Sequence, residues 1–169
     1  MTATMATMAT DPRRFRMAMG RFATGVTVIT TRTADGGVHG MTANGFMSVS
    51  LDPPLILVSL GACTMARHLE EGNQFAVTVL AADQEEVSRH FGGRPSLSVG
   101  FDSHGGYDFV PGGLAFIGCR ITDRHPAGDH TLFLGEVEHL EFRDGAPLLF
   151  YTGSYRTLHA GLTDDVFFY

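Results

Sequence analysis

The sequence has few cysteines and no long apolar run. Among its 169 residues there are only two cysteines, Cys63 and Cys119. They lie far apart and match no metal-binding spacing, and two thiols make no disulfide framework, so the sequence predicts a protein of the reducing cytoplasm. No apolar run approaches the roughly 18 residues of a transmembrane helix, so we expect no membrane partner.

The sequence also lacks a concentration of basic residues. Lysine and arginine together number 12 against 18 acidic residues, and the formal net charge is -6. Because binding to a nucleic-acid backbone requires clustered cations, nucleic acid is not an expected partner. There is no G-x-G-x-x-G loop after a strand, no Walker A loop, no H-E-x-x-H pair and no G-x-S-x-G elbow. These absences argue against a metal site and against a serine hydrolase.

The length and composition are those of one compact domain. Hydrophobic residues make up 44% of the chain and charged residues 18%, an ordinary balance for a folded domain. Residues 1–10 are a near-repeat of Met, Ala and Thr without a basic stretch before an apolar core, so we interpret them as a disordered tail. The domain is expected over residues 11–160, and residues 161–169 are expected to form a C-terminal tail.

Three helices are predicted from start and stop signals. The first begins at Asp11–Pro12, continues through Phe22 and ends at Gly25. The second covers residues 65–71, and the third ends near Phe91. The expected N-caps of the second and third helices are Thr64 and Asp83.

Strand signals outnumber helix signals. Runs of β-branched and apolar residues predict strands at 26–31, 38–41, 55–60, 75–80, 114–123, 132–142 and 148–151. Residues 94–113 are rich in Gly, Ser and Pro and are expected to form a long loop. Because strands and helices do not alternate regularly, a small barrel with two or three flanking helices is favoured over a doubly wound parallel sheet.

Three segments concentrate small and polar residues suited to ligand binding. Residues 39–54 would let backbone approach a flat ligand, and residues 59–64 run into a helix start, where NH groups suit a phosphate. In residues 128–137, His130 stands at a strand entrance beside Asp129, which could raise its pKa or orient it. Taken singly, each segment is better explained as a polar strand end, a helix cap or a turn than as a site.

Taken in order, six segments of the chain resemble the flavin reductase family of two-component monooxygenases. These segments are residues 22–30, 40–44, 48–54, 75–80, 128–137 and 147–151. The resemblance covers roughly residues 15–158. It implies a mainly β fold, the six-stranded FMN-binding split β-barrel of Greek-key type with two or three flanking helices.

The resemblance also implies roles for individual residues. The flavin ring and its ribityl chain would be lined by Thr42, Ala43, Asn44, Ser48, Val49, Ser59, Leu60, Gly61 and Phe91. Cys63 and Thr64 would lie at the flavin phosphate. His130 would be the catalytic residue on the nicotinamide side, with Tyr155 and Arg156 nearby. The chain departs from the family at Gly45, where a Ser is frequent, and in the weakly basic stretch 61–63.

The implied activity is hydride transfer from NADH or NADPH to FMN or FAD, an EC 1.5.1-type oxidoreduction. The reduced flavin would pass to a partner monooxygenase, and a homodimer would complete the flavin cleft, to which the apolar run 166–169 also points. Two alternatives stay open. One is a non-catalytic flavin- or haem-binding module with His130 as axial ligand, and the other is an enzyme like pyridoxamine-phosphate oxidase, which would need a basic phosphate pocket.

Overall fold

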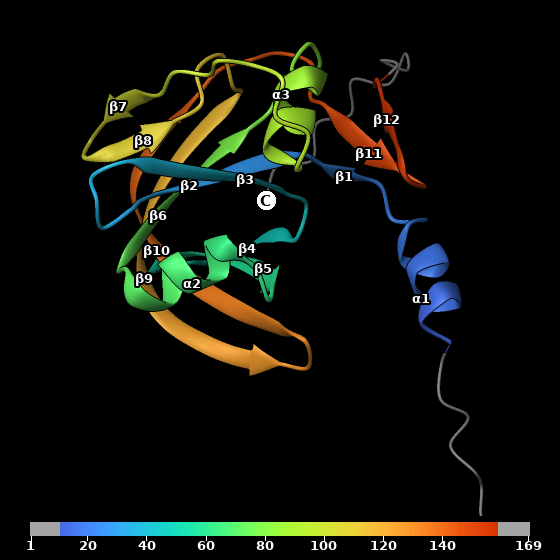
Figure 1. Ribbon diagram of the computed structural model, residues 1–169, viewed down its shortest axis with the longest axis horizontal. Helices are drawn as coiled ribbons and strands as arrows, with labels where there is room; N and C mark the ends of the chain where they lie inside the picture. Colours follow the sequence, from blue (N-terminus) through green and yellow to red (C-terminus); the bar gives the residue numbers. More distant parts are fainter. Residues whose placement is uncertain (1–10, 159–169) are drawn as a thin grey trace, which may run out of the picture.

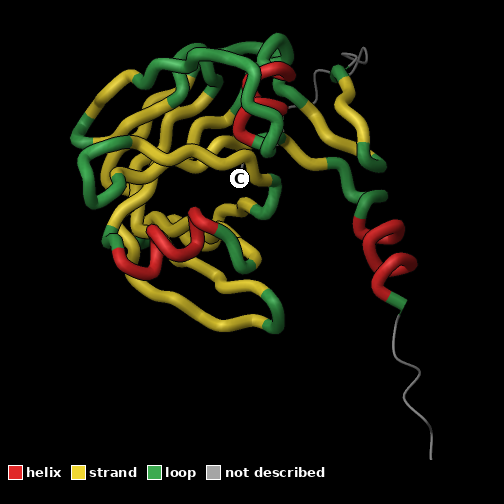
Figure 2. The backbone as a smooth tube through the Cα atoms, viewed as in Figure 1, coloured by secondary structure: helices red, strands yellow, loops and turns green. Residues whose placement is uncertain are grey.

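The computed structural model describes residues 11–158, in which strands dominate and three helices lie around them (Figure 1). The helices are α1 (Pro12–Met19), α2 (Thr64–Glu71) and α3 (Glu85–Phe91). The strands are β1 (Thr24–Gly25), β2 (Thr27–Arg32), β3 (Val38–Ala43), β4 (Phe46–Leu51), β5 (Pro54–Gly61), β6 (Gln74–Val79), β7 (Asp102–His104), β8 (Tyr107–Phe109), β9 (Ala115–Ala127), β10 (His130–Phe142), β11 (Leu149–Tyr151) and β12 (Ser154–Arg156). Figure 2 shows this excess of strand over helix, which confirms the predicted mainly β class. The two expected tails and the run 166–169 lie outside the described residues.

A seven-stranded antiparallel sheet forms the body of the molecule. Its strand order is β3-β2-β6-β9-β10-β5-β4. The two edge strands, β3 and β4, follow each other in the chain and are joined only by Asn44 and Gly45, so the sheet must curl until its edges approach each other there. No ladder pairs β3 with β4 in the described part of the chain, so the predicted six-stranded split β-barrel is not confirmed. The sheet is a strongly curled but open one.

Strand β2 is buried on both faces because a hydrophobic core lies on each side of it. Ile29 belongs to one core, which Met65 and Leu69 of α2 help to form. Val28 belongs to the second core, against which Phe91 of α3 packs. The run of β-branched residues predicted as a strand therefore suits a position between two layers of packing. Helices α2 and α3 supply apolar residues to one core each.

Helix α1 contributes to neither core. It has no buried residue, and Figure 1 shows it at the right of the view, before the start of β1 and apart from the curled sheet. Asp11 caps it as predicted, since its Oδ1 accepts a hydrogen bond from Arg13 N at 2.9 Å. The helix ends at Met19, however, with Gly20 as its cap, so the prediction that it continues through Phe22 to Gly25 is wrong. Gly20 is the nearer stop signal, because glycine is a poor helix former.

The N-caps of the other two helices each lie one residue away from the predicted ones. Cys63, not Thr64, caps α2, because its Sγ accepts a hydrogen bond from Ala66 N at 3.4 Å. Helix α3 follows Gln84 rather than Asp83, and the Gln84 amide makes no cap hydrogen bond to the helix. Its Oε1 instead accepts from Ala81 N at 3.0 Å, which ties the start of α3 to the end of the β6 region.

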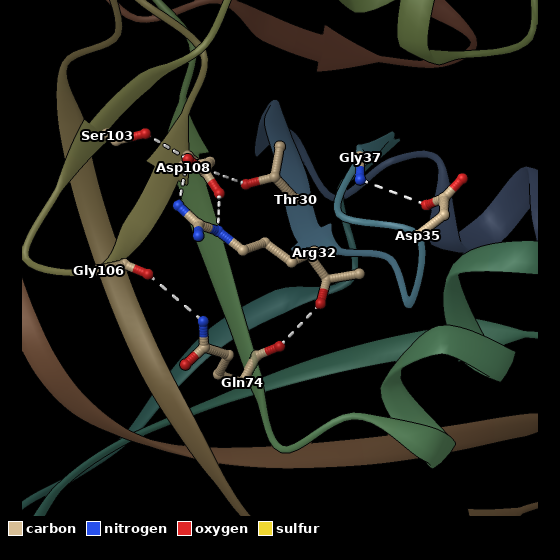
Figure 3. Close-up of polar contacts among 9 residues, drawn as sticks. Thr30, Arg32, Asp35, Gly37, Gln74, Ser103, Gly106 and Asp108 are labelled. Carbon is tan, nitrogen blue, oxygen red and sulfur yellow. Dashed lines mark hydrogen bonds and ion pairs between the residues drawn. The ribbon is translucent and has the colours of Figure 1, made fainter.

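The predicted loop over residues 94–113 contains the β7–β8 hairpin, so that prediction is wrong in part. The hairpin turns at Gly105 and Gly106, whose φ angles are 58° and 89°, the conformation that tight hairpin turns require. Figure 3 shows how Asp108 of β8 is fastened to β2: Arg32 Nε and Nη2 donate to its carboxylate at 2.6 and 3.1 Å. The hydroxyl of Ser103 donates to the same carboxylate. We call this group the Asp108 latch.

Candidate functional site

The start of β10 and the end of β5 bring His130 beside the start of α2. In the antiparallel pairing of these strands, His130 lies opposite Gly61. A groove of about 670 Å³ opens here. It is lined by Gly61, Ala62, Cys63, Thr64, Ala66, Arg67, Glu70, Pro126, Gly128, Asp129, His130 and Thr131. Four predicted site residues, among them His130, therefore meet in one place, which we call the His130 groove.

The imidazole of His130 is held in position by its neighbour in the chain. Its Nδ1 lies 2.8 Å from Asp129 Oδ1, and the Nε2 edge of the ring lies 3.5 Å from where a Cβ on Gly61 would stand. The hydrogen bond and the charge of His130 lower the pKa of the Asp129 carboxyl. Asp129 thus stays ionised and fixes the ring, while the other ring nitrogen is directed toward Gly61.

Arg67 gives the His130 groove a positive charge that the sequence analysis missed. One turn into α2, its Nη2 donates to Thr64 Oγ1 at 3.1 Å, so the guanidinium lies at the start of the helix. The helix start itself offers NH groups and a partial positive charge. Glu70 and Asp129 line the same groove, so its lining carries one guanidinium against two carboxylates, and Arg67 acts locally at the helix start. The spacing of three residues between Thr64 and Arg67 is the signal from which the contact could have been predicted.

A second hollow, of about 190 Å³, lies between the end of β3, α3 and β12. It is lined by Val26, Thr42, Ala43, Asn44, Ser88, Phe150 and Tyr155, and we call it the Asn44 pocket. Thr42 Oγ1 donates to Ser88 O at 2.7 Å, and Ser88 Oγ lies 2.8 Å from Tyr155 Oη. These bonds tie the three elements together around the pocket. Ser88 is fully buried, and nothing in the sequence had marked it.

Contacts close to the β3–β4 connection link the two hollows. Ser59 N donates to Gly45 O at 2.8 Å, and a Cβ on Gly45 would stand only 3.0 Å from Ser59 O. Glycine therefore permits the close approach of the two backbones. On the other side, Cys63 Sγ lies 3.7 Å from Met41 Sδ. Residues adjoining the Asn44 pocket thus contact residues adjoining the His130 groove.

Several predicted residues lie outside both hollows. Leu60 is 2% exposed and packs in the first core, so only its backbone is available to a ligand. Ser48 and Val49 are exposed on β4, where the register shifts. Phe91 covers Gly40, since a Cβ there would stand 2.5 Å from Phe91 Cε1.

The structure does not bring all the predicted nicotinamide residues together. Arg156 lines a further groove of about 300 Å³ with Ala82, Glu85 and Leu148. Tyr155 lines that groove and the Asn44 pocket, whereas His130 lines neither. The described residues include no group of three or more His, Cys, Asp or Glu placed to hold a metal ion. Nor does any helix within residues 11–158 have the length and apolar character needed to cross a membrane.

Comparison with known proteins gives a single answer over almost the whole described chain. The model of the flavin reductase like domain matches residues 19–159. An NADH-dependent flavin reductase of Rhodococcus sp is 47% identical over 152 residues, which cover 87% of this chain and 86% of that protein. The reductase component of 4-hydroxyphenylacetate 3-monooxygenase from Thermus thermophilus is 38% identical over 146 residues, covering 85% of this chain and 95% of the relative.

The same similarity is found among solved structures. The structure of the flavin reductase PheA2 in its native state superposes with a TM-score of 0.86 at 46% sequence identity. The match covers 89% of this chain and 100% of that one. Both sequence and backbone therefore agree with one family over the segments that build the two hollows.

Proposed function

Because this chain belongs to the flavin reductase like domain family, we propose that it transfers hydride from NADH or NADPH to FMN or FAD. The reduced flavin then passes to a partner monooxygenase, as the Thermus thermophilus relative, a reductase component of 4-hydroxyphenylacetate 3-monooxygenase, suggests. One observation carries the proposal most directly: the Asn44 pocket and the His130 groove gather eight of the predicted site residues on adjoining elements.

The residues of the two hollows fit the parts of a flavin. The Asn44 pocket offers small side chains, a hydroxyl and an exposed amide to a flat ring. Gly45 and Gly61 have no side chain between them and their neighbours, since a Cβ would stand 3.0 Å from Ser59 O at Gly45 and 3.5 Å from the His130 ring at Gly61. The His130 groove supplies Arg67 and the start of α2 for a phosphate. Arg67 thus supplies a positive charge close to the stretch 61–63, which has no basic residue of its own.

When bound, the flavin itself supplies the hydride chemistry, and the protein supplies orientation and electrostatics. Asn44 and nearby backbone NH groups would stabilise the negative charge that the ring gains on reduction. His130, held by Asp129, would orient the nicotinamide by a hydrogen bond from its free ring nitrogen. In this role His130 does not donate a proton to the reaction.

The activity is tested by following NADH and NADPH oxidation with FMN, FAD and riboflavin in turn. We expect steady oxidation with at least one pair, which also decides the flavin and the nicotinamide. Absence of oxidation with every pair would refute the proposal. A Soret band in the purified protein would favour the haem-binding alternative, and turnover of a pyridoxamine phosphate would favour the oxidase.

The role of His130 is tested by His130→Ala. We expect a higher KM for the nicotinamide and a turnover about 10-fold lower, because an orienting group contributes through geometry. Thr131→Ala, on the next residue lining the same groove, is the matched control. Unchanged KM and turnover in His130→Ala would show that the ring has no such role.

We also propose a homodimer located in the cytoplasm. Phe15, Met17 and Met19 of α1 are each more than half exposed, and the helix buries no residue of its own, so a second copy is a suitable cover. Light scattering behind size exclusion should give twice the chain mass, and a monomer mass would refute the dimer. The two free cysteines support a reducing compartment.

A further inference from the structure

A third hollow adjoins the Asn44 pocket and contains charges that the proposed reaction has not used. It has a volume of about 390 Å³ and lies between the end of α3 and the β11–β12 turn. Its lining is Glu85, Arg89, Gly92, Arg94, Phe150, Gly153, Ser154 and Tyr155, and we call it the α3 groove. It shares Phe150 and Tyr155 with the Asn44 pocket, so the two hollows meet at this aromatic pair.

The charged side chains of the α3 groove leave an excess of positive charge. Arg89 Nε and Nη2 donate to Glu85 Oε1 at 2.9 and 2.6 Å, so this carboxylate is already neutralised. Arg94 forms no ion pair with any of the residues described, 11–158. Two guanidiniums and one carboxylate give a net charge of +1 in a chain whose formal charge is -6. An anion would therefore be attracted here against the sign of the whole protein.

The Tyr155 ring on the aromatic side of the groove is held by contacts with three neighbouring side chains. The guanidinium of Arg89 lies over the Tyr155 ring, 5.0 Å from its centre. Phe150 meets the same ring edge-on at 5.4 Å, and Tyr155 Oη is fixed by the buried Ser88. A rigid ring beside two forked cations suits a ligand that carries both a flat heterocycle and phosphates.

We infer that the α3 groove binds an adenosine diphosphate group, with Arg89 and Arg94 on its phosphates and the Tyr155–Phe150 pair beside its purine. The volume lies within the range of small-ligand pockets. The inference rests on the proposed function, which supplies two molecules with this group, the nicotinamide dinucleotide and FAD. The nicotinamide dinucleotide would reach the α3 groove from the Asn44 pocket through the shared aromatic pair. FAD would reach it only if its phosphates ran toward the α3 groove instead of into the His130 groove.

The test is Arg94→Gln in the full chain, with KM measured for NADH and for each flavin. If the groove holds the dinucleotide, KM for NADH rises about 10-fold with FMN and with FAD alike, since one charge-assisted hydrogen bond is lost. If it holds FAD, KM rises for FAD alone. Arg120→Gln is the matched control, because it removes an exposed guanidinium paired with Glu136 and Glu138 elsewhere on the sheet. Unchanged KM values in Arg94→Gln would overturn the inference.

A binding measurement separates this inference from the proposed activity. Calorimetric titration with ADP should show binding to the wild type and at least 10-fold weaker binding to Arg94→Gln. That result would support the groove even if the protein oxidised no NADH, which would refute the activity alone. Equal ADP binding by both proteins, or none by the wild type, would overturn the inference while leaving flavin reduction intact.

Discussion

Replacing Asp108 by Asn should lower the free energy of unfolding by about 2 kcal/mol. The carboxylate is 7% exposed and accepts two hydrogen bonds from Arg32 and one from Ser103 (Figure 3). Asn keeps the shape but turns an NH2 group toward one of these donors. Each charge-assisted bond contributes roughly 1.5–3 kcal/mol. Because the Arg32 side chain is 54% exposed, water can hydrogen-bond to the freed guanidinium. The loss in free energy of unfolding is therefore smaller than the sum over the three bonds.

Removing Arg32, the other partner, should lower the free energy of unfolding by more than Asp108→Asn does. Arg32→Met leaves a buried carboxylate without its cation, whereas Asp108→Asn leaves a cation that water can solvate. The comparison is made by urea unfolding followed by circular dichroism at pH 7, with Arg120→Gln as an exposed ion-pair control that should unfold nearly as the wild type does. A smaller loss in Arg32→Met than in Asp108→Asn would refute the burial argument.

The Asp108 latch should also make the free energy of unfolding depend on pH. The Arg32 hydrogen bond lowers the pKa of the Asp108 carboxyl below its ordinary value. A depressed pKa stabilises the fold above the unfolded-state pKa, about 3.9, and that contribution is lost as pH falls through the folded-state pKa. The difference in free energy of unfolding between wild type and Asp108→Asn should therefore become smaller below about pH 4. If this difference stayed constant with pH, the charge of Asp108 would not be its source.

Two further substitutions test the packing and the groove. Gly40→Ala should lower the free energy of unfolding by about 1–3 kcal/mol, because its Cβ would stand 2.5 Å from Phe91 Cε1. Gly100→Ala, whose Cβ would have no atom within 4 Å, should lower it far less in the same thermal or urea unfolding measurement. Equal effects of the two substitutions would contradict this account. Arg67→Gln should raise KM for FMN about 10-fold and leave riboflavin, which has no phosphate, unaffected. Equal changes for both flavins would refute a phosphate role.

Local patterns in the sequence predicted local structure well. The β-branched run of β2, the glycine after α2 and the turn before β10 are each decided by neighbouring residues. The helix starts were harder, since Cys63 and Thr64 are both able to cap α2 and only the folded geometry selects one. The β7–β8 hairpin was hidden in a polar segment, although the Gly105–Gly106 pair was a turn signal.

The site could be predicted only in parts. The pairing that places His130 opposite Gly61 joins residues far apart in the chain, so periodicity could not predict it; the family resemblance gave only a separate role to each of the two residues. The sequence said nothing of Ser88, because a serine inside a helix has no pattern that indicates what its hydroxyl will contact. For the same reason, the division of the predicted residues between two hollows became visible only in three dimensions.

The connection through Asn44 and Gly45 acts as a short tether between the two edges of the curled sheet. Three Cα–Cα steps separate Ala43 from Phe46, a reach of at most about 11 Å. The edges can part at this end no farther than the tether allows, whatever side chains line the hollows. Chain length at this one point, rather than chemistry, thus limits how far the Asn44 pocket and the Gly45–Ser59 contact can move apart.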